Sequence, residues 1–136
     1  MATGTTVIPN DDTIPQITEG DEYMTQAITP LSAANLLSID HLGIYASSGA
    51  GTMSCALFQD ATTDALAASM IGLVGGGSAT LFTVSHIMRA GTTSSTTFRI
   101  RTGNGSAGTT TFNGFGSARK LGGVMGSQLV VTEIMV

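Results

Sequence analysis

The sequence predicts an all-β protein, an antiparallel β-sandwich of about eight strands that follows an extended N-terminal arm. Apolar and polar residues alternate with a period of two in several segments, which is typical of strands that bury one face. Groups of glycines separate these segments, as expected for tight turns. Thr, Ser and Gly make up 52 of the 136 residues and charged residues only 10%, so hydroxyl groups and backbone must cover much of the surface.

Six segments alternate clearly enough to be assigned as strands, and they cover residues 22–29, 36–45, 52–59, 81–89, 96–101 and 128–136. Segment 36–45 is apolar on both faces, so we expect a central strand covered on each side. Residues 60–71 could form a helix capped by Asp60, but the glycines that follow favour a turn and then a strand. The glycine groups at 75–77 and 103–105 lack the lysine and helix of a phosphate-binding loop and are predicted to be hairpin turns.

The first 21 residues differ in kind from the rest. Pro9 and Pro15 interrupt any β-ladder, so residues 9–20 are expected to be extended and irregular. We therefore divide the chain into an N-terminal arm, residues 1–21, and a sandwich domain, residues 22–136. The arm could cross to a neighbouring subunit, and its removal is expected to leave the sandwich folded.

The charges, which sum to −4, are distributed unevenly along the chain. Residues 1–88 contain eight acidic residues and no Lys or Arg, whereas residues 89–136 contain all five bases and one acid. Either the two groups fold back on one another within a subunit, or the acidic arm of one subunit docks on basic strands of another. Five scattered cations argue against binding of nucleic acid, which requires a basic face.

No arrangement of residues typical of a catalytic or metal site is present, so we expect no enzyme activity and no cofactor. Cys55, the only cysteine, lies in an apolar strand, which predicts a buried core thiol. His41 and His86 occupy strand positions between apolar residues, where a packed and hydrogen-bonded histidine is more common than a ligand. Calcium remains a weaker alternative, because carboxylates gather at Asp11, Asp12, Glu19, Asp21 and Glu22.

The sequence contains no recognisable targeting or membrane segment. No apolar run reaches the roughly 18 residues that a membrane span needs. Residues 1–10 lack the basic and apolar regions of a signal peptide. We therefore expect a soluble protein that is made in the cytoplasm and does not associate with a membrane.

Short runs of residues spread over nearly the whole chain carry a family resemblance. They include IPNDDTIPQ at 8–16, ALFQD at 56–60, AGTT at 90–93, FNG at 112–114 and LGGV at 121–124. These runs resemble a family of bacteriophage structural modules, known from the ends of tail-fibre-like proteins and from short virion proteins. The resemblance implies a jelly-roll-like sandwich that forms trimers and brings no catalytic residues. Lys120 and Leu121 depart from the family, in which an aromatic residue is expected beside the glycine pair.

The resemblance, the acidic arm and the low-charge surface together lead us to expect a non-catalytic structural protein on the virion exterior. The first hypothesis is a homotrimeric capsid decoration or cement protein, whose partners are its own copies and the major capsid protein or other virion proteins. Met1 lies only a few residues before the connector-like run, which favours a stand-alone protein. The arm would anchor it through Pro9, Asp11, Asp12, Ile14, Pro15, Gln16 and Glu19.

The alternative hypothesis is a tail-fibre or spike tip that binds a host-surface receptor, most simply a glycan, through loops at one end of the sandwich. Polar and aromatic side chains close to predicted turns would form that surface, namely Asn104, Phe112, Asn113, Phe115 and Gln128. A depolymerising enzyme is a third and weaker hypothesis, because no pair of carboxylates is placed to converge on a pocket.

Overall fold

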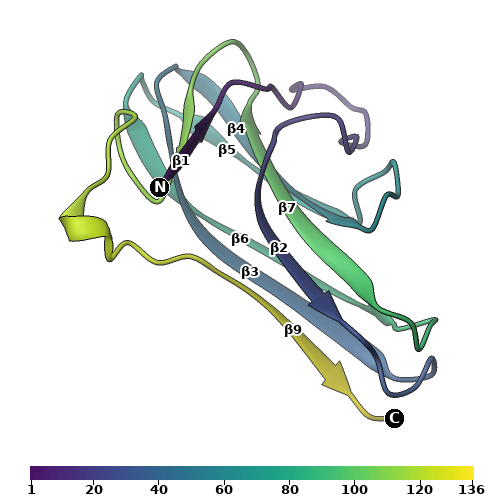
Figure 1. Ribbon diagram of the computed structural model, residues 1–136. Coiled ribbons are helices and arrows are strands. Elements are labelled where there is room, and N and C mark those ends of the chain that lie inside the picture. The colour runs from purple at the N-terminus through teal and green to yellow at the C-terminus, as the bar shows by residue number, and fades with distance from the viewer.

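The computed structural model describes residues 1–136 and consists of two antiparallel sheets packed face to face (Figure 1). The first sheet contains β1 (Ala2–Gly4), β8 (Thr110–Phe112), β3 (Leu36–Ser47), β6 (Ser78–Arg89) and β9 (Gln128–Ile134). The second contains β2 (Asp21–Ile28), β7 (Thr96–Asn104), β4 (Gly51–Gln59) and β5 (Ala67–Leu73). The only helical element is one 3-10 turn, η1 (Leu121–Gly123), so no helix is long and apolar enough to cross a membrane.

The strand pairing confirms the predicted jelly-roll-like sandwich. The first eight strands pair β1 with β8, β2 with β7, β3 with β6 and β4 with β5, all antiparallel. This nested pairing is that of a long hairpin rolled into two sheets, in the orders β1-β8-β3-β6 and β2-β7-β4-β5. Strand β9 is an addition, which pairs with β3 over Leu36–Leu42 on the same side that β8 occupies over Tyr45–Ser47.

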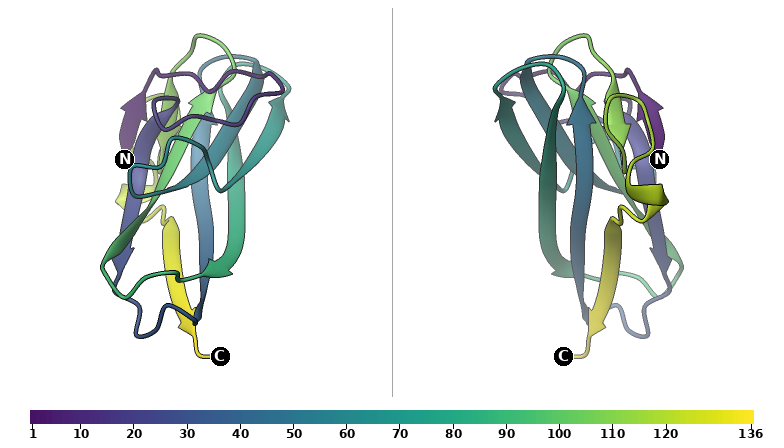
Figure 2. Two further views of the ribbon diagram at one scale, coloured as in Figure 1. Left: turned by 90° about the vertical axis from the view of Figure 1, so that its right-hand side faces the viewer. Right: turned by 90° about the vertical axis from the view of Figure 1, so that its left-hand side faces the viewer.

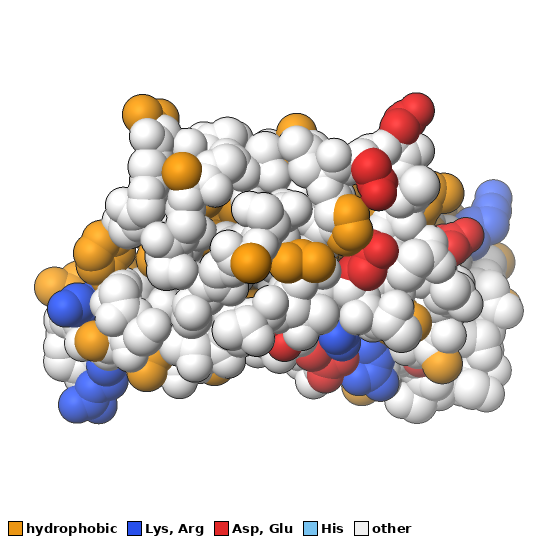
Figure 3. All heavy atoms as spheres, turned by 90° about the horizontal axis from the view of Figure 1, so that it is seen from above, with side chains coloured by type: hydrophobic (Ala, Val, Ile, Leu, Met, Phe, Trp, Pro, Cys, Tyr) orange, Lys and Arg blue, Asp and Glu red, His pale blue; other side chains and the backbone are white.

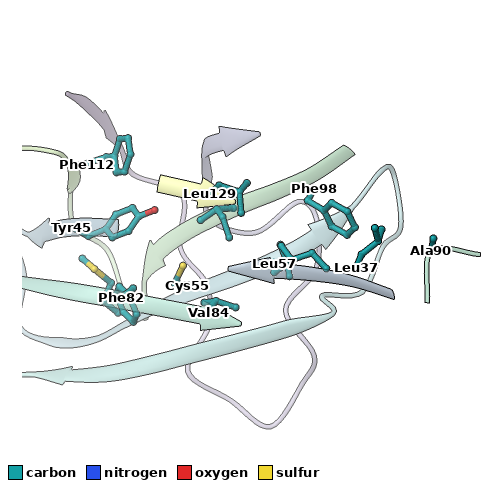
Figure 4. Close-up of a cluster of buried hydrophobic side chains, with 13 residues drawn as sticks. Leu37, Tyr45, Cys55, Leu57, Phe82, Val84, Ala90, Phe98, Phe112 and Leu129 are labelled. Atoms are coloured by element: carbon teal, nitrogen blue, oxygen red, sulfur yellow. The ribbon is translucent and has the colours of Figure 1, made fainter. Parts of the chain in front are cut away.

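The core between the sheets is built from the inward-facing residues of both. Tyr45 lies at its aromatic end, where its ring centroid is 5.1 Å from Phe112, 5.6 Å from Tyr23 and 5.9 Å from Phe82 (Figure 4). Aliphatic residues continue the core towards the other end of the sandwich. The buried members are Leu37, Ile39, Tyr45, Met53, Cys55, Leu57, Phe82, Val84, Ala90, Phe98, Ile100, Phe112 and Leu129.

All six predicted strands are present, with ends that shift by a few residues. Residues 60–71 form a turn that leads into β5, so the helical alternative is excluded. Both predicted glycine hairpins are wrong. Residues 103–104 belong to β7, and the turn at 75–77 connects β5 to β6, which lie in different sheets. Strands β1 and β8 were not predicted, because three residues are too few to show a period.

The division of the chain at residue 21 is also wrong. Strand β1 is the first strand of the jelly roll, and residues 5–20 are the connection from β1 to β2. This connection is irregular, as predicted, but it lies across the outer face of the second sheet (Figure 2, left). Its Ile8 is only 1% exposed and packs in a separate cluster with Ala56 and Phe58 of β4. The arm is therefore a third layer over β4 within the same subunit.

The strand that is covered on both faces is β4 rather than β3. Residues Met53 to Phe58 of β4 are all buried, since the core lies beneath one face and the arm over the other. Strand β3 is central in its sheet, as predicted, but no other segment of the chain lies across most of its outer face (Figure 2, right). The arm thus covers part of the outer face of the second sheet, over β4, whereas it does not reach the outer face of the first sheet.

Candidate interaction surfaces

The predicted anchoring arm is attached to its own subunit at several points. Thr6 donates two hydrogen bonds to the Asp21 carboxylate, at 2.9 Å from its backbone N and 2.8 Å from its hydroxyl. The Ile8 amide donates to the carbonyl oxygen of Asn104 at 3.0 Å. A Cβ atom on Gly103 would lie 2.6 Å from the backbone oxygen of Thr6, so the close approach of the arm requires glycine there.

Further along the arm, the predicted anchoring residues Pro15, Gln16 and Glu19 also bind their own sandwich. The Ala65 amide donates to the Pro15 carbonyl oxygen at 3.0 Å, and the Gln16 side-chain amide donates to the Asp64 carboxylate at 3.0 Å. The side-chain carboxylate of Glu19 accepts a hydrogen bond from the backbone amide of Gln16 at 2.9 Å. The remaining four residues of the predicted set are exposed and free of such contacts, namely Pro9, Asp11, Asp12 and Ile14.

Basic residues of β7 meet acidic residues of the N-terminal region within one subunit. Arg99 forms a salt bridge with Glu22 at 3.1 Å, and Arg101 approaches the same carboxylate at 3.8 Å. Arg101 also donates to the carbonyl oxygens of Glu19, at 2.8 Å, and Gly20, at 2.7 Å. For these residues the intrasubunit alternative from the sequence is correct, because their charges are paired without a neighbour.

Two adjoining hollows lie between the arm and β5, with volumes of about 300 and 190 Å³. Both are lined by Asp11, Thr13, Pro15 and Ala68. The Asp11 carboxylate accepts hydrogen bonds from the Thr13 hydroxyl and amide, which lower the pKa of that carboxyl. Nowhere do three or more His, Cys, Asp or Glu side chains gather in a way that could hold a metal ion. The five carboxylates that suggested calcium in the sequence are therefore not gathered into one such cluster.

The structure does not bring the predicted loop-surface residues together. Asn104 and Phe112 are buried and cannot contact a receptor, so their assignment to an exposed binding surface is wrong. Asn113 accepts a hydrogen bond from the Ser127 hydroxyl at 2.6 Å, which ties the loop after β8 to the start of β9. Phe115 is 40% exposed in that loop, and Gln128 is exposed at the first position of β9.

His41 is packed and hydrogen-bonded within the core, as predicted. Its Nδ1 lies 3.0 Å from the Gln128 carbonyl oxygen, and its Nε2 lies 3.2 Å from the Tyr45 hydroxyl. A carbonyl oxygen can only accept, so Nδ1 carries the proton and Nε2 accepts from the tyrosine. A Cβ atom on Gly43 would lie 2.6 Å from Nε2, so glycine leaves the space that this pair occupies. Burial lowers the pKa of His41 and favours the neutral ring.

This environment predicts a pH-dependent stability. The folded pKa of His41 lies below the ordinary value, so the unfolded chain takes up a proton first as the pH falls below about 6.5. We expect the thermal midpoint to fall between pH 7.5 and pH 5.5, and to fall less in the His41→Gln variant. Scanning calorimetry of both proteins measures the difference, and an identical fall in the two would contradict this role of His41.

The other two groups with potential chemistry are also held in the sandwich. Cys55 is completely buried, which confirms the predicted core thiol, and burial raises its pKa to about 12. A thiol in this state is a poor nucleophile at neutral pH. His86 is half-buried opposite Ile39 in the β3–β6 ladder. Neither residue lines one of the two hollows.

The arm does not cover the outer face of the sheet formed by β9, β3 and β6, which we term the open face (Figure 2, right). Residues of these strands that alternate with the core positions point outward from the sheet. Many are apolar, and Ile87 is 60% exposed. The apolar members are Leu36, Leu42 and Ile44 of β3, Leu81 and Ile87 of β6, and Val130 and Ile134 of β9.

Only two charged side chains stand at outward positions on these three strands. Asp40 lies in the middle of β3 and accepts hydrogen bonds from the hydroxyls of Ser38, at 2.9 Å, and Ser85, at 2.6 Å. Arg89 stands at the end of β6, where it donates to the Ala34 carbonyl oxygen at 2.9 Å. In the view from above, by contrast, acidic side chains gather on one side of the molecule with basic side chains beside them (Figure 3). The open face therefore resembles an interface more than a solvated sheet.

Comparison with known proteins adds no assignment of family or function. No family model matches the sequence, and no curated protein matches it. The apolar residues on both sides of segment 36–45 predicted a strand covered on each face, and the structure leaves most of its outer face uncovered.

Proposed function

We propose that this protein is a non-catalytic structural protein of a bacteriophage particle, a homotrimeric decoration or cement protein on the capsid exterior. The observation that carries the proposal is the open face, which extends over three strands and exposes the apolar side chains of Leu81, Ile87, Val130 and Ile134. Exposed apolar side chains on an uncovered sheet face, here interspersed with Ser and Thr, are found where proteins make lasting contacts with partners. The runs that resemble phage structural modules supply the setting.

The chemistry of the molecule supports a structural role over an enzymatic one. The single thiol is buried, and His41 is neutral in the core. Among the acidic residues near the arm, Glu22 pairs with Arg99, and no three carboxylates lie close together. Decoration of a capsid requires a stable fold and surfaces for assembly. The exposed part of the arm, Pro9 to Ile14, is the candidate for contact with the capsid, because all six of its residues are exposed.

Sedimentation with emptied phage capsids tests this proposal. The purified protein is expected to co-sediment with capsids that lack it and to raise the temperature at which they open. A variant with Asp11→Ala and Asp12→Ala should weaken co-sedimentation, whereas Lys120→Ala, which changes an exposed charged residue outside the arm, should not. Failure of the unmodified protein to bind any capsid would refute decoration.

A tail-fibre or spike tip that binds a host glycan is the second candidate. The observation in its favour is the loop after β8, where Phe115 is partly exposed. Binding of the purified protein to host cells, blocked by free host polysaccharide, would support it. A decoration protein should bind capsids and should not bind host cells.

A further inference from the structure

We infer that the open face is the surface through which copies of this chain join one another, with Asp40 of one copy against Arg89 of the next. The inference deepens the proposed function and rests on its claim of self-association. It leaves the exposed part of the arm, which lies on the opposite sheet, free for the particle.

The first argument compares the outer faces of the two sheets. Strand β4 has apolar residues on its outer side, and the arm covers them with Ile8 and Ile17. Strand β3 also has apolar residues on its outer side, the half-buried Leu42 and Ile44, but no segment lies across most of that face. Beside them on β6, Leu81 is 54% exposed and Ile87 is 60% exposed. Leaving such side chains in water costs about 25 cal/mol per Å² of apolar surface. A partner protein that packs against the open face would remove this apolar surface from water and recover that free energy.

The second argument is the size of the open face. Strands β3 and β6 each have 12 residues and β9 has seven. With a rise of about 3.3 Å per residue and a spacing of about 4.8 Å between strands, the three strands span roughly 500 Å² in projection. Side chains that stand out from the sheet add to that area. A stable contact buries about 800 Å² of accessible surface on each partner, so the open face is of the required size.

The third argument identifies the cover as another copy. The open face contains one carboxylate and one guanidinium, and neither forms a salt bridge within the subunit. Asp40 pairs with Ser85 in the ladder, four residues from Arg89, which separates the two charges by about 13 Å along the strands. A surface with one charge of each sign among uncharged residues can be complementary to a second copy of itself. A contact between copies can satisfy both charges at once.

Light scattering on the purified full chain, over a range of concentrations, tests the inference. The unmodified protein is expected to be an oligomer, and Ile87→Lys is expected to convert it to a 13.8 kDa monomer. The matched control is Met70→Lys, because Met70 is 59% exposed on β5 in the other sheet, and this variant should remain oligomeric. Circular dichroism verifies that each variant is folded.

Charge reversal tests the pairing itself. Asp40→Arg alone or Arg89→Asp alone should weaken self-association at least about tenfold, because like charges then meet across the contact. The double variant should restore it. An unmodified protein that stays monomeric, single reversals without effect, or a double variant that fails to recover would each overturn the inference. Sedimentation with capsids tests the proposed function separately. If the protein self-associates through the open face but does not bind capsids, the decoration role is refuted and the inference about self-association stands.

Discussion

Replacement of Ile8 by alanine is expected to lower the free energy of unfolding by about 3 kcal/mol, the usual cost of truncating a buried isoleucine. Ile8 is 1% exposed and packs against Ala56 and Phe58, so its removal leaves a cavity between the arm and β4. The arm passes too close to Gly103 to slide into that space. Urea denaturation followed by circular dichroism measures the change.

The matched control for this prediction is Ile14→Ala, in the same arm. Ile14 is 56% exposed, and its truncation should change the free energy of unfolding by less than about 0.5 kcal/mol. Equal effects of the two substitutions would show that the arm is not docked as described. Removal of residues 1–20 should for the same reason destabilise the sandwich strongly, contrary to the expectation from sequence that the remainder folds unaided.

Replacement of Tyr45 by alanine is expected to cost about 4 kcal/mol, at the level found for large aromatic residues in protein cores. Its ring is fully buried and contacts those of Tyr23, Phe82 and Phe112. The same substitution also removes the hydroxyl that donates to His41. Thermal unfolding of the variant should show a midpoint well below that of the unmodified protein.

Phe115→Ala is the matched control for Tyr45→Ala. Phe115 is partly exposed in the loop after β8, outside the main core, so its truncation should cost less than about 1 kcal/mol. A large loss of stability from Phe115→Ala, or a small one from Tyr45→Ala, would contradict the described core.

The fold was predictable from sequence because its longer strands bury one face. Strand β6 alternates Phe82 and Val84 with exposed neighbours over 12 residues, and that period survives any tertiary context. Strands β1 and β8 have three residues each, and what defines them is their pairing partners. The nested order of pairing depends on contacts far apart in the chain, which local patterns do not encode; the jelly-roll assignment therefore depended on the family resemblance.

The position of the arm could not be predicted for a related reason. Pro9 and Pro15 correctly indicated irregular backbone, but irregular segments can either extend from a protein or lie on it. One signal was available, because Ala56 and Phe58 are apolar on the face of β4 opposite to Cys55 and Leu57. A strand with two apolar faces needs two covers. Segment 36–45 was expected to be covered on both faces, whereas no cover was expected for the outer face of segment 52–59.

The candidate surface residues are polar or aromatic and lie close to predicted turns, but closeness to a turn in the sequence does not establish exposure. Asn104 follows Gly103 but belongs to β7, and Phe112 precedes Asn113 but closes the aromatic end of the core. The open face consists of ordinary strand residues such as Leu81 and Val130, which stand out only when the register aligns them. The sequence shows how these residues are spaced along one strand. It does not show which residues lie beside them on the two neighbouring strands.

Electron cryo-microscopy of the intact particle tests the central claim of a decoration protein most directly. The account predicts density for this jelly roll on the capsid exterior, in clusters of copies whose β9–β3–β6 faces are buried against one another. It also predicts that residues 9–14 are turned towards the capsid. Density for this chain only on the tail, or no copy of it on the particle, would contradict the account.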